Sequence, residues 1–214
     1  MSRKQTSVAK LADFYMAAKL FVISEGYAPE IDWQEQREIT NISERDFLRE
    51  GAWVILSSGM RESIIRQRFP YISEAFLKWE SAEKIVRQER RCIEDAFPHF
   101  RHLPKLKAIV NIAFHIFENG FNRVIESIKH SGLDYITKLS YMGPATSCHL
   151  AKNLGLPLAK PDRHLLRITR KAGYSSPQEL CNTIAEQTGD KISVVDVVLW
   201  RFATLEPHYI KYFD

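Results

Sequence analysis

Helical periodicity is the feature of this sequence that most restricts its fold. Apolar residues recur every three to four positions over most of the chain, whereas no useful stretch alternates between apolar and polar residues as a strand does. We find no internal repeat. The pattern predicts about ten helices joined by short loops, so the chain is expected to be all-α.

The expected helices cover residues 8–23, 43–56, 61–67, 81–97, 105–118, 121–130, 163–172, 177–186 and 193–205, and one more follows a turn at Gly143. Ser43 and Asp46 are close to a capping box, which marks a helix start. The polar stretch 27–41 contains Pro29 and predicts a loop. Pro70 is expected to end the helix before it.

The composition is that of an ordinary globular protein. The chain has 214 residues, 45% hydrophobic and 26% charged, which suits one large domain or two small lobes. It shows no secretory signal and no apolar run long enough to span a membrane, so we expect a cytoplasmic protein. Three scattered cysteines argue against disulfides and are too few for a four-cysteine iron–sulfur cluster.

The charge is mildly basic, with a formal net charge of +4, which is compatible with DNA binding. Two clusters stand out. The first holds Arg61, Arg66 and Arg68, and is equally consistent with a solvated helix face. The second follows Asp162, and we expect it to contact phosphate; it consists of Arg163, His164, Arg167, Arg170 and Lys171.

The segments 139–149 and 160–167 carry the clearest chemistry. In the first, a turn with Gly143 and Pro144 opens into an apolar helix that ends near Gly155. Backbone N–H groups at such a helix start can hold a phosphate. The second delivers one carboxylate, Asp162, beside His164. A carboxylate can stabilise an oxocarbenium-like sugar and position a water for hydrolysis of an N-glycosidic bond.

This pairing resembles the helix-hairpin-helix superfamily of DNA glycosylases, over residues from about 45 to 205 and most specifically between 139 and 167. The resemblance implies a two-lobed helical fold with a DNA-binding cleft between the lobes. It implies one glycosylase unit over 1–214, with lobe A at about 30–138 and lobe B at about 1–29 plus 139–214, including a helix-hairpin-helix at 134–155. It also implies a monomer acting on double-stranded DNA.

The family pattern of Pro, Asp, any residue, His and a later Arg is matched by Pro161, Asp162, His164 and Arg167. The resemblance implies that Asp162 is the catalytic carboxylate. The plainer interpretation is that Asp162 caps the helix that begins at Arg163, because Asp is a favoured N-cap. The two roles are compatible.

The family's hairpin pattern corresponds to Leu139–Ser147 here. Gly143 keeps the second glycine, while Tyr141 replaces the first and is expected to change the turn, because residues other than glycine avoid positive φ. The DNA phosphates are expected to contact Gly143, Ala145, Thr146, His164 and Arg167. The family further implies a K⁺ or Na⁺ ion at the carbonyls of Ser140 and Met142. An ordinary helix–turn–helix hinge is the alternative.

Ala145 sets the expected reaction type. Bifunctional members of the family place at this position a lysine that attacks the sugar, and alanine cannot do so. The chain is therefore expected to be monofunctional, with water as the nucleophile, an abasic site as the product and no lyase activity. No cofactor is expected apart from the monovalent cation.

Two further groups are candidates for handling an extruded base. Met60 and Arg61 follow Gly59 in a loop that resembles the family's wedge loop, although Gly59 is also a plain helix end. Tyr141 and Trp33 are the candidate base-pocket aromatics, Trp33 because it lies in the expected loop. Lys105 begins a segment that resembles a lobe helix of the family and is interpreted as structural.

The leading hypothesis is a glycosylase that removes a damaged or modified base, either in repair or in defence against phage DNA that carries glucosylated hydroxymethylcytosine. The main alternative is a non-catalytic helix-hairpin-helix module that binds DNA. A helical protein-interaction domain is a weaker third hypothesis. Asp162 discriminates between the first two, because a passive clamp does not need a carboxylate near DNA.

Overall fold

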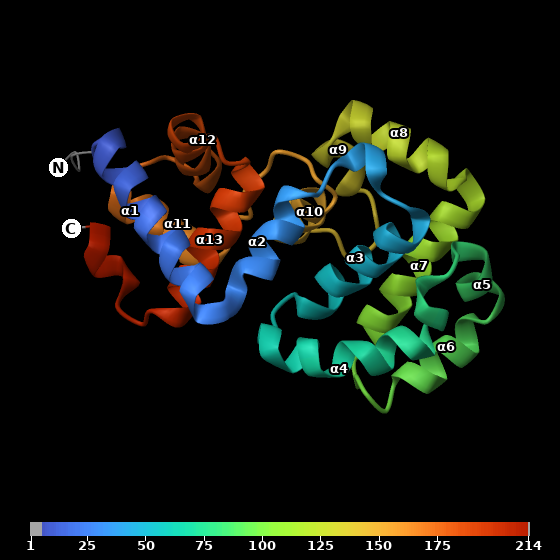
Figure 1. The fold of residues 1–214 in the computed structure, drawn as a ribbon. Coiled ribbons are helices and arrows are strands. Elements are labelled where there is room, and N and C mark those ends of the chain that lie inside the picture. The colour runs from blue at the N-terminus through green and yellow to red at the C-terminus, as the bar shows by residue number, and fades with distance from the viewer. Residues whose placement is uncertain (1–5, 214) are drawn as a thin grey trace. The chain divides into compact units, whose positions relative to one another are not determined.

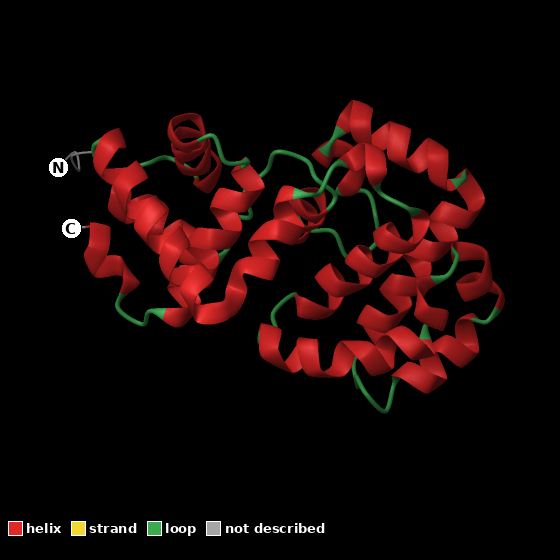
Figure 2. Ribbon diagram, in the orientation of Figure 1, coloured by secondary structure: helices red, strands yellow, loops and turns green. Residues whose placement is uncertain are grey.

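The computed structural model of the chain describes residues 6–213. Each regular element in that range is helical, and no strand occurs in it (Figures 1 and 2). The all-α prediction is therefore confirmed. None of the helices described is both long enough and apolar enough to cross a lipid bilayer.

The chain divides into two compact units. The central unit runs from Glu38 to Leu154, and the terminal unit combines the residues up to Arg37 with those from Gly155 onward. The boundaries expected from the sequence, near residues 29 and 139, differ from these. Residues 139–154, which hold the hairpin turn, belong to the central unit.

The terminal unit is built around α13 (Ile192–Leu205), whose apolar residues lie nearly all round the helix. The helices that contact it are α1 (Val8–Val22), α2 (Ala28–Glu35), α11 (Arg163–Ala172) and α12 (Pro177–Thr188). A π-helical turn over Ile23–Tyr27 joins α1 to α2, and a 3₁₀ turn over Tyr209–Phe213 follows α13.

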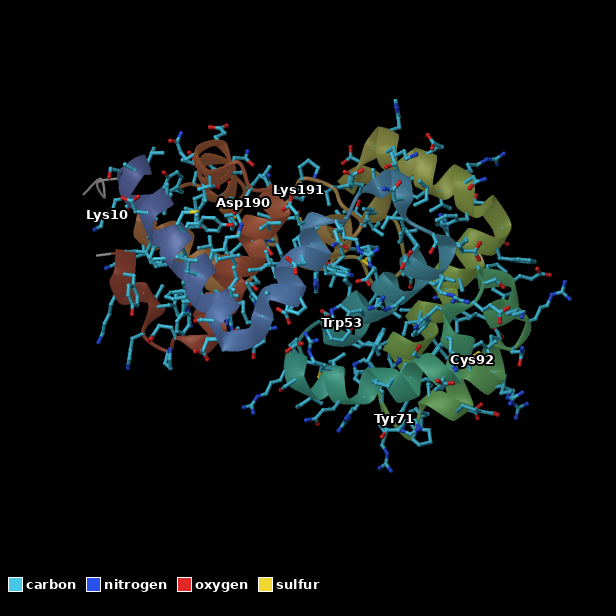
Figure 3. All side chains as sticks on the ribbon, viewed as in Figure 1. Lys10, Trp53, Tyr71, Cys92, Asp190 and Lys191 are labelled. Carbon is cyan, nitrogen blue, oxygen red and sulfur yellow. The ribbon has the colours of Figure 1, made fainter. Side chains whose placement is uncertain are left out.

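Asp190, in the loop between α12 and α13 (Figure 3), accepts hydrogen bonds from two side chains of α1. The buried Tyr15 hydroxyl donates to Asp190 Oδ2 at 2.6 Å, and Lys19 Nζ donates to Oδ1 at 2.8 Å. Burial, followed by the hydrogen bond to Asp190, raises the pKa of Tyr15 well above its ordinary value. The N-terminal helix is thus joined by polar contacts to a loop formed late in the chain.

The central unit is organised around α3 (Glu44–Ser57) and α7 (Leu103–Asn119), which pack against each other. A Cβ at Gly51 would meet Ile112 Cδ1 at 3.4 Å, an ordinary van der Waals contact between the two helices. The remaining helices are α4 (Glu62–Ala75), α5 (Ala82–Arg87), α6 (Glu89–Ala96), α8 (Phe121–Ser131), α9 (Leu133–Ile136) and α10 (Pro144–Asn153).

Capping contacts explain why several predicted helix ends are confirmed. Ser43 and Asp46 form the complete capping box at the start of α3. Gly132, with φ at +53°, ends α8 as expected. α11 matches the predicted range 163–172, and α1, α7, α12 and α13 lie close to theirs.

The predicted loop over 27–41 is wrong for its first half, because α2 occupies Ala28–Glu35. Pro29 lies in the first turn of that helix, where a proline is tolerated since the first N–H groups have no helical acceptor. Trp33 therefore lies on a helix and not in a loop.

Two further helix predictions are also wrong. α4 continues through Pro70 to Ala75, and the single helix expected over 81–97 is divided at Gln88, whose φ of −120° and ψ of 23° are not helical. Aromatic packing explains the first difference. Phe69 contacts Trp53 on α3 edge to face at 5.2 Å and stacks on Trp79 at 5.7 Å, which holds α4 in place around the proline.

Candidate functional site

The hairpin turn leads into α10, whose first residue is Pro144. Proline has no N–H group, and the N–H of Ser147 already bonds to the Gly143 carbonyl at 2.8 Å. The amides of Ala145 and Thr146 are therefore the first-turn donors that no helical carbonyl accepts. Gly143 and Ala145 are exposed. The helix start therefore has two backbone donors without a helical acceptor, and phosphate binding there stays a prediction.

Side-chain hydroxyls of the same turn donate hydrogen bonds to its backbone carbonyls. Thr146 Oγ1 is 3.1 Å from the Tyr141 carbonyl and 3.0 Å from the Gly143 carbonyl. Ser147 Oγ lies 2.9 Å from the Gly143 carbonyl. The carbonyls approached here are those of Tyr141 and Gly143, whereas the cation expected from the sequence would use Ser140 and Met142. A cation at those two carbonyls stays a prediction.

Tyr141 adopts the left-handed conformation, with φ at +67°. The premise that a tyrosine at this position avoids positive φ is therefore not met, since Tyr141 takes the positive φ that a glycine readily adopts. The expected change in the turn stays a prediction. Gly143 has φ at −77°, and a Cβ there would meet Thr146 Oγ1 at an ordinary 3.9 Å. The residue of this turn that adopts a positive φ is thus Tyr141 and not Gly143.

A buried lysine, Lys105 at the start of α7, links the hairpin to the end of α3. Its Nζ donates to the carbonyl of Leu56 at 2.9 Å and also to that of Ser58. The same Nζ lies 5.7 Å from the centre of the exposed Tyr141 ring. Burial lowers the pKa of Lys105 from its ordinary value. The sequence indicated a structural lysine here but not its partners.

The expected wedge loop comes directly after Leu56 and Ser58 in the sequence. α3 ends at Ser57, Gly59 has φ at +70°, and the Met60 N–H bonds to the Ser57 carbonyl at 3.0 Å. This is the helix-end role that the sequence left open for Gly59. Met60 and Arg61 are exposed after it, so both side chains are available to a ligand.

Asp162 is the N-cap of α11. Its Oδ1 accepts from the N–H of His164 at 2.8 Å and from that of Leu165 at 3.0 Å. Both bonds go to one oxygen, so Oδ2 has no hydrogen bond among the residues the structure describes. Asp162 is half-buried. The capping role is therefore present, and it leaves one carboxylate oxygen for other chemistry.

His164 is half-buried, and both of its ring nitrogens have protein partners. Arg163 Nε donates to Nε2 at 3.2 Å, and Nδ1 lies 3.2 Å from the Tyr209 hydroxyl. Burial lowers the pKa of His164, and nearby cations, including Arg163 and Arg167, add to this against the opposing effect of Asp162. A neutral ring that accepts a hydrogen bond at Nε2 carries its proton on Nδ1. The Nδ1–H group then donates a hydrogen bond to the Tyr209 hydroxyl.

The rest of α11 separates into an apolar and a basic side. Leu165 and Ile168 are buried in the core of the terminal unit. Arg163, Arg167 and Arg170 are exposed. The basic side is the expected phosphate-binding cluster, with Arg167 accessible and His164 engaged with protein partners.

The aromatic residues of the terminal unit mostly hold its core. Trp33 is half-buried on α2, and the guanidinium of Arg37 lies 4.4 Å from its ring centre. Tyr27 and Trp200 lie 4.2 and 4.5 Å from the guanidinium of Arg201, which is buried. The Arg37 guanidinium thus covers one face of the Trp33 ring, and the base-pocket role of Trp33 stays a prediction.

The predicted site residues are distributed over both units. The central unit carries Met60, Arg61, Ser140, Tyr141, Met142, Gly143, Ala145 and Thr146. The terminal unit carries Trp33, Asp162, His164 and Arg167. Within residues 6–213, no group of three or more His, Cys, Asp or Glu side chains is arranged to hold a metal ion.

Comparisons with protein-family models, with curated proteins and with solved structures find no match to this chain.

Proposed function

We propose that the chain is a monofunctional DNA glycosylase that hydrolyses the N-glycosidic bond of a damaged or modified base and leaves an abasic site. The observation that carries the proposal is the single-oxygen capping by Asp162. Its Oδ1 caps α11, and Oδ2 remains without a hydrogen bond in the described residues, at the start of a helix that carries three exposed arginines. A carboxylate at that position can stabilise an oxocarbenium-like sugar or orient a water.

The hairpin supports the same proposal through phosphate binding. The amides of Ala145 and Thr146 and the exposed Arg167 can each contact the DNA backbone. Ala145 supplies no amine to attack the sugar, so water is the nucleophile. The proposal includes the two-lobed arrangement of the helix-hairpin-helix glycosylases, with duplex DNA in the cleft and a monomeric enzyme inside the cell.

The substrate is a base that is damaged or deliberately modified. Repair would involve an alkylated, oxidised or deaminated base. Defence would involve a bulky phage base such as glucosylated hydroxymethylcytosine. In both cases the base must leave the stack, and Met60 and Arg61 are the exposed side chains proposed to fill the gap.

Asp162→Asn tests the chemistry because asparagine caps a helix about as well as aspartate, so α11 should be retained. A panel of duplexes, each with one damaged, deaminated or glucosylated base, is incubated with enzyme and analysed with and without alkali. We expect strand breaks only after alkali, and a loss of about a hundredfold or more in base release for Asp162→Asn. Asp13→Asn, at an exposed aspartate of α1, is the matched control and should behave as wild type.

The capping role of Asp162 also favours a second candidate, a non-catalytic module that uses the hairpin to bind DNA. That candidate predicts salt-sensitive DNA binding without base release across the panel, and the same binding for Asp162→Asn. Strand breaks without alkali would contradict the monofunctional assignment, because another amine would then act as the nucleophile.

A further inference from the structure

The loop that carries Asp162 contains two tight turns, each centred on a proline. The Leu158 N–H bonds to the Leu156 carbonyl at 2.8 Å across Pro157. The Asp162 N–H bonds to the Lys160 carbonyl, also at 2.8 Å, across Pro161. Proline suits the centre of such a three-residue turn because its φ is fixed and it has no N–H group to satisfy.

Side chains from two other helices satisfy the two amides that remain between these turns. The Ala159 N–H donates to Gln178 Oε1 at 2.9 Å. The Lys160 N–H donates to Asp196 Oδ2 at 2.7 Å. Each backbone N–H from residue 158 to residue 162 thus has a named acceptor. The N–H donors of this non-helical segment are therefore all satisfied.

Gln178, on α12, holds the loop at two points, since its Nε2 also donates to the Pro157 carbonyl at 3.1 Å. Asp196, on α13, is a carboxylate with only 1% of its surface exposed. Burying a carboxylate is unfavourable unless it is well bonded, and a charged acceptor forms a strong bond to an amide. This residue is therefore well placed to fix the position of the loop.

We propose that Gln178 and Asp196 are positioning residues for Asp162. They fix the position of residues 157–161. The turn from Lys160 to Asp162 then places Asp162 at the start of α11. Neither residue touches Asp162 directly, and neither belongs to the motifs that the sequence singled out. The functional part of this inference rests on the proposed glycosylase activity, whereas the structural part does not.

The structural part is tested by amide hydrogen exchange of the full chain. Gln178→Leu removes the acceptor of Ala159 N–H, and exchange at residues 158–162 should accelerate by about tenfold or more while the α13 amides keep their protection. Gln187→Leu makes the same change at an exposed position of α12 and should leave the loop unchanged. Equal loop protection in Gln178→Leu and wild type would overturn the proposal.

Asp196 provides the second variant pair. Asp196→Leu should expose the Lys160 amide to exchange, while Asp196→Asn keeps an acceptor oxygen and should restore most of the protection. Loop protection that is identical in all three forms would overturn the role of Asp196. If loop protection is restored in Asp196→Asn, the effect of Asp196→Leu is due to the lost hydrogen bond to the loop and not to altered core packing.

The functional part is measured as single-turnover base release against DNA binding. Misplacing Asp162 should slow base release by about ten- to a hundredfold in Gln178→Leu, with the Kd for a duplex carrying an abasic site unchanged. Faster exchange with an unchanged release rate would overturn positioning for catalysis. A wild-type chain that releases no base from any duplex would overturn the proposed function alone, because hydrogen exchange reports on the loop without any activity.

Discussion

Tyr141 is the residue of the hairpin turn that adopts an unfavourable backbone conformation. It occupies the left-handed region at φ +67°, where a side chain is unfavourable. Thr146 Oγ1 braces its carbonyl, and the buried ammonium of Lys105 lies near its ring. These contacts explain how the turn keeps a tyrosine in a conformation that glycine adopts more easily.

Substitutions at Tyr141 should therefore follow backbone preference. Tyr141→Val, a β-branched residue, should lower the free energy of unfolding by about 1–2 kcal/mol. Tyr141→Gly should stay within about 1 kcal/mol of wild type, because relief of strain is offset by the flexibility of glycine in the unfolded chain. Urea denaturation measures both. Equal destabilisation by glycine and valine would show that the ring contacts matter more than φ.

The sequence predicted single residues best where a short motif determines them. Asp162 as a helix cap and Gly143 as part of a turn follow from neighbours within a few residues. Lys105, Gln178 and Asp196 have polar partners in segments distant in the sequence. No local pattern specifies such partners. The sequence therefore indicated a structural Lys105 without its partners, and Gln178 and Asp196 became apparent only in the folded structure.

At the scale of helices, prolines account for much of the difference between expectation and structure. In the sequence, Pro29 predicts a loop and Pro70 predicts a helix end, whereas in the structure Pro29 lies in the first turn of α2 and Pro70 lies inside α4. Helix periodicity predicted the other long helices because buried apolar faces determine them. Where tertiary packing around Phe69 holds a helix together, the local signal of a proline is insufficient.

The end of α3 depends on a side chain from α7. Lys105 donates to the carbonyls of Leu56 and Ser58, which lie at the C-terminal end of α3, where helical N–H groups no longer reach. Lys105→Met should leave these acceptors without their donor and lower the free energy of unfolding by about 1–3 kcal/mol.

Lys107→Met on the same helix is the matched control, because Lys107 is exposed and its replacement should have little effect. Thermal unfolding of both variants and the wild type measures the difference. Similar stability of the two variants would contradict the capping role of Lys105.

At the scale of the whole molecule, His164 links folding stability to pH. Its pKa in the folded chain is lowered, chiefly by burial, so the unfolded chain binds the proton more readily. This contribution is fully favourable above the ordinary histidine pKa of about 6.5. It is lost progressively as the pH falls from there toward the lowered pKa of the folded state.

His164→Asn removes the titrating ring but keeps a polar group near the Tyr209 hydroxyl. We expect the fall in Tm between about pH 7 and pH 5 to be smaller in this variant than in wild type. Scanning calorimetry at matched ionic strength makes the comparison. An unchanged pH dependence of Tm would show that other groups dominate acid destabilisation.

The division of the chain has a consequence for its synthesis. The central unit is one continuous segment, whereas the terminal unit needs both ends of the chain. During translation, α1 leaves the ribosome before the central unit, and its apolar residues Leu11, Tyr15, Ala18 and Val22 are buried in a core completed by α12 and α13. The central unit can therefore fold before α12 and α13 are synthesised, and the apolar face of α1 must avoid incorrect partners until then.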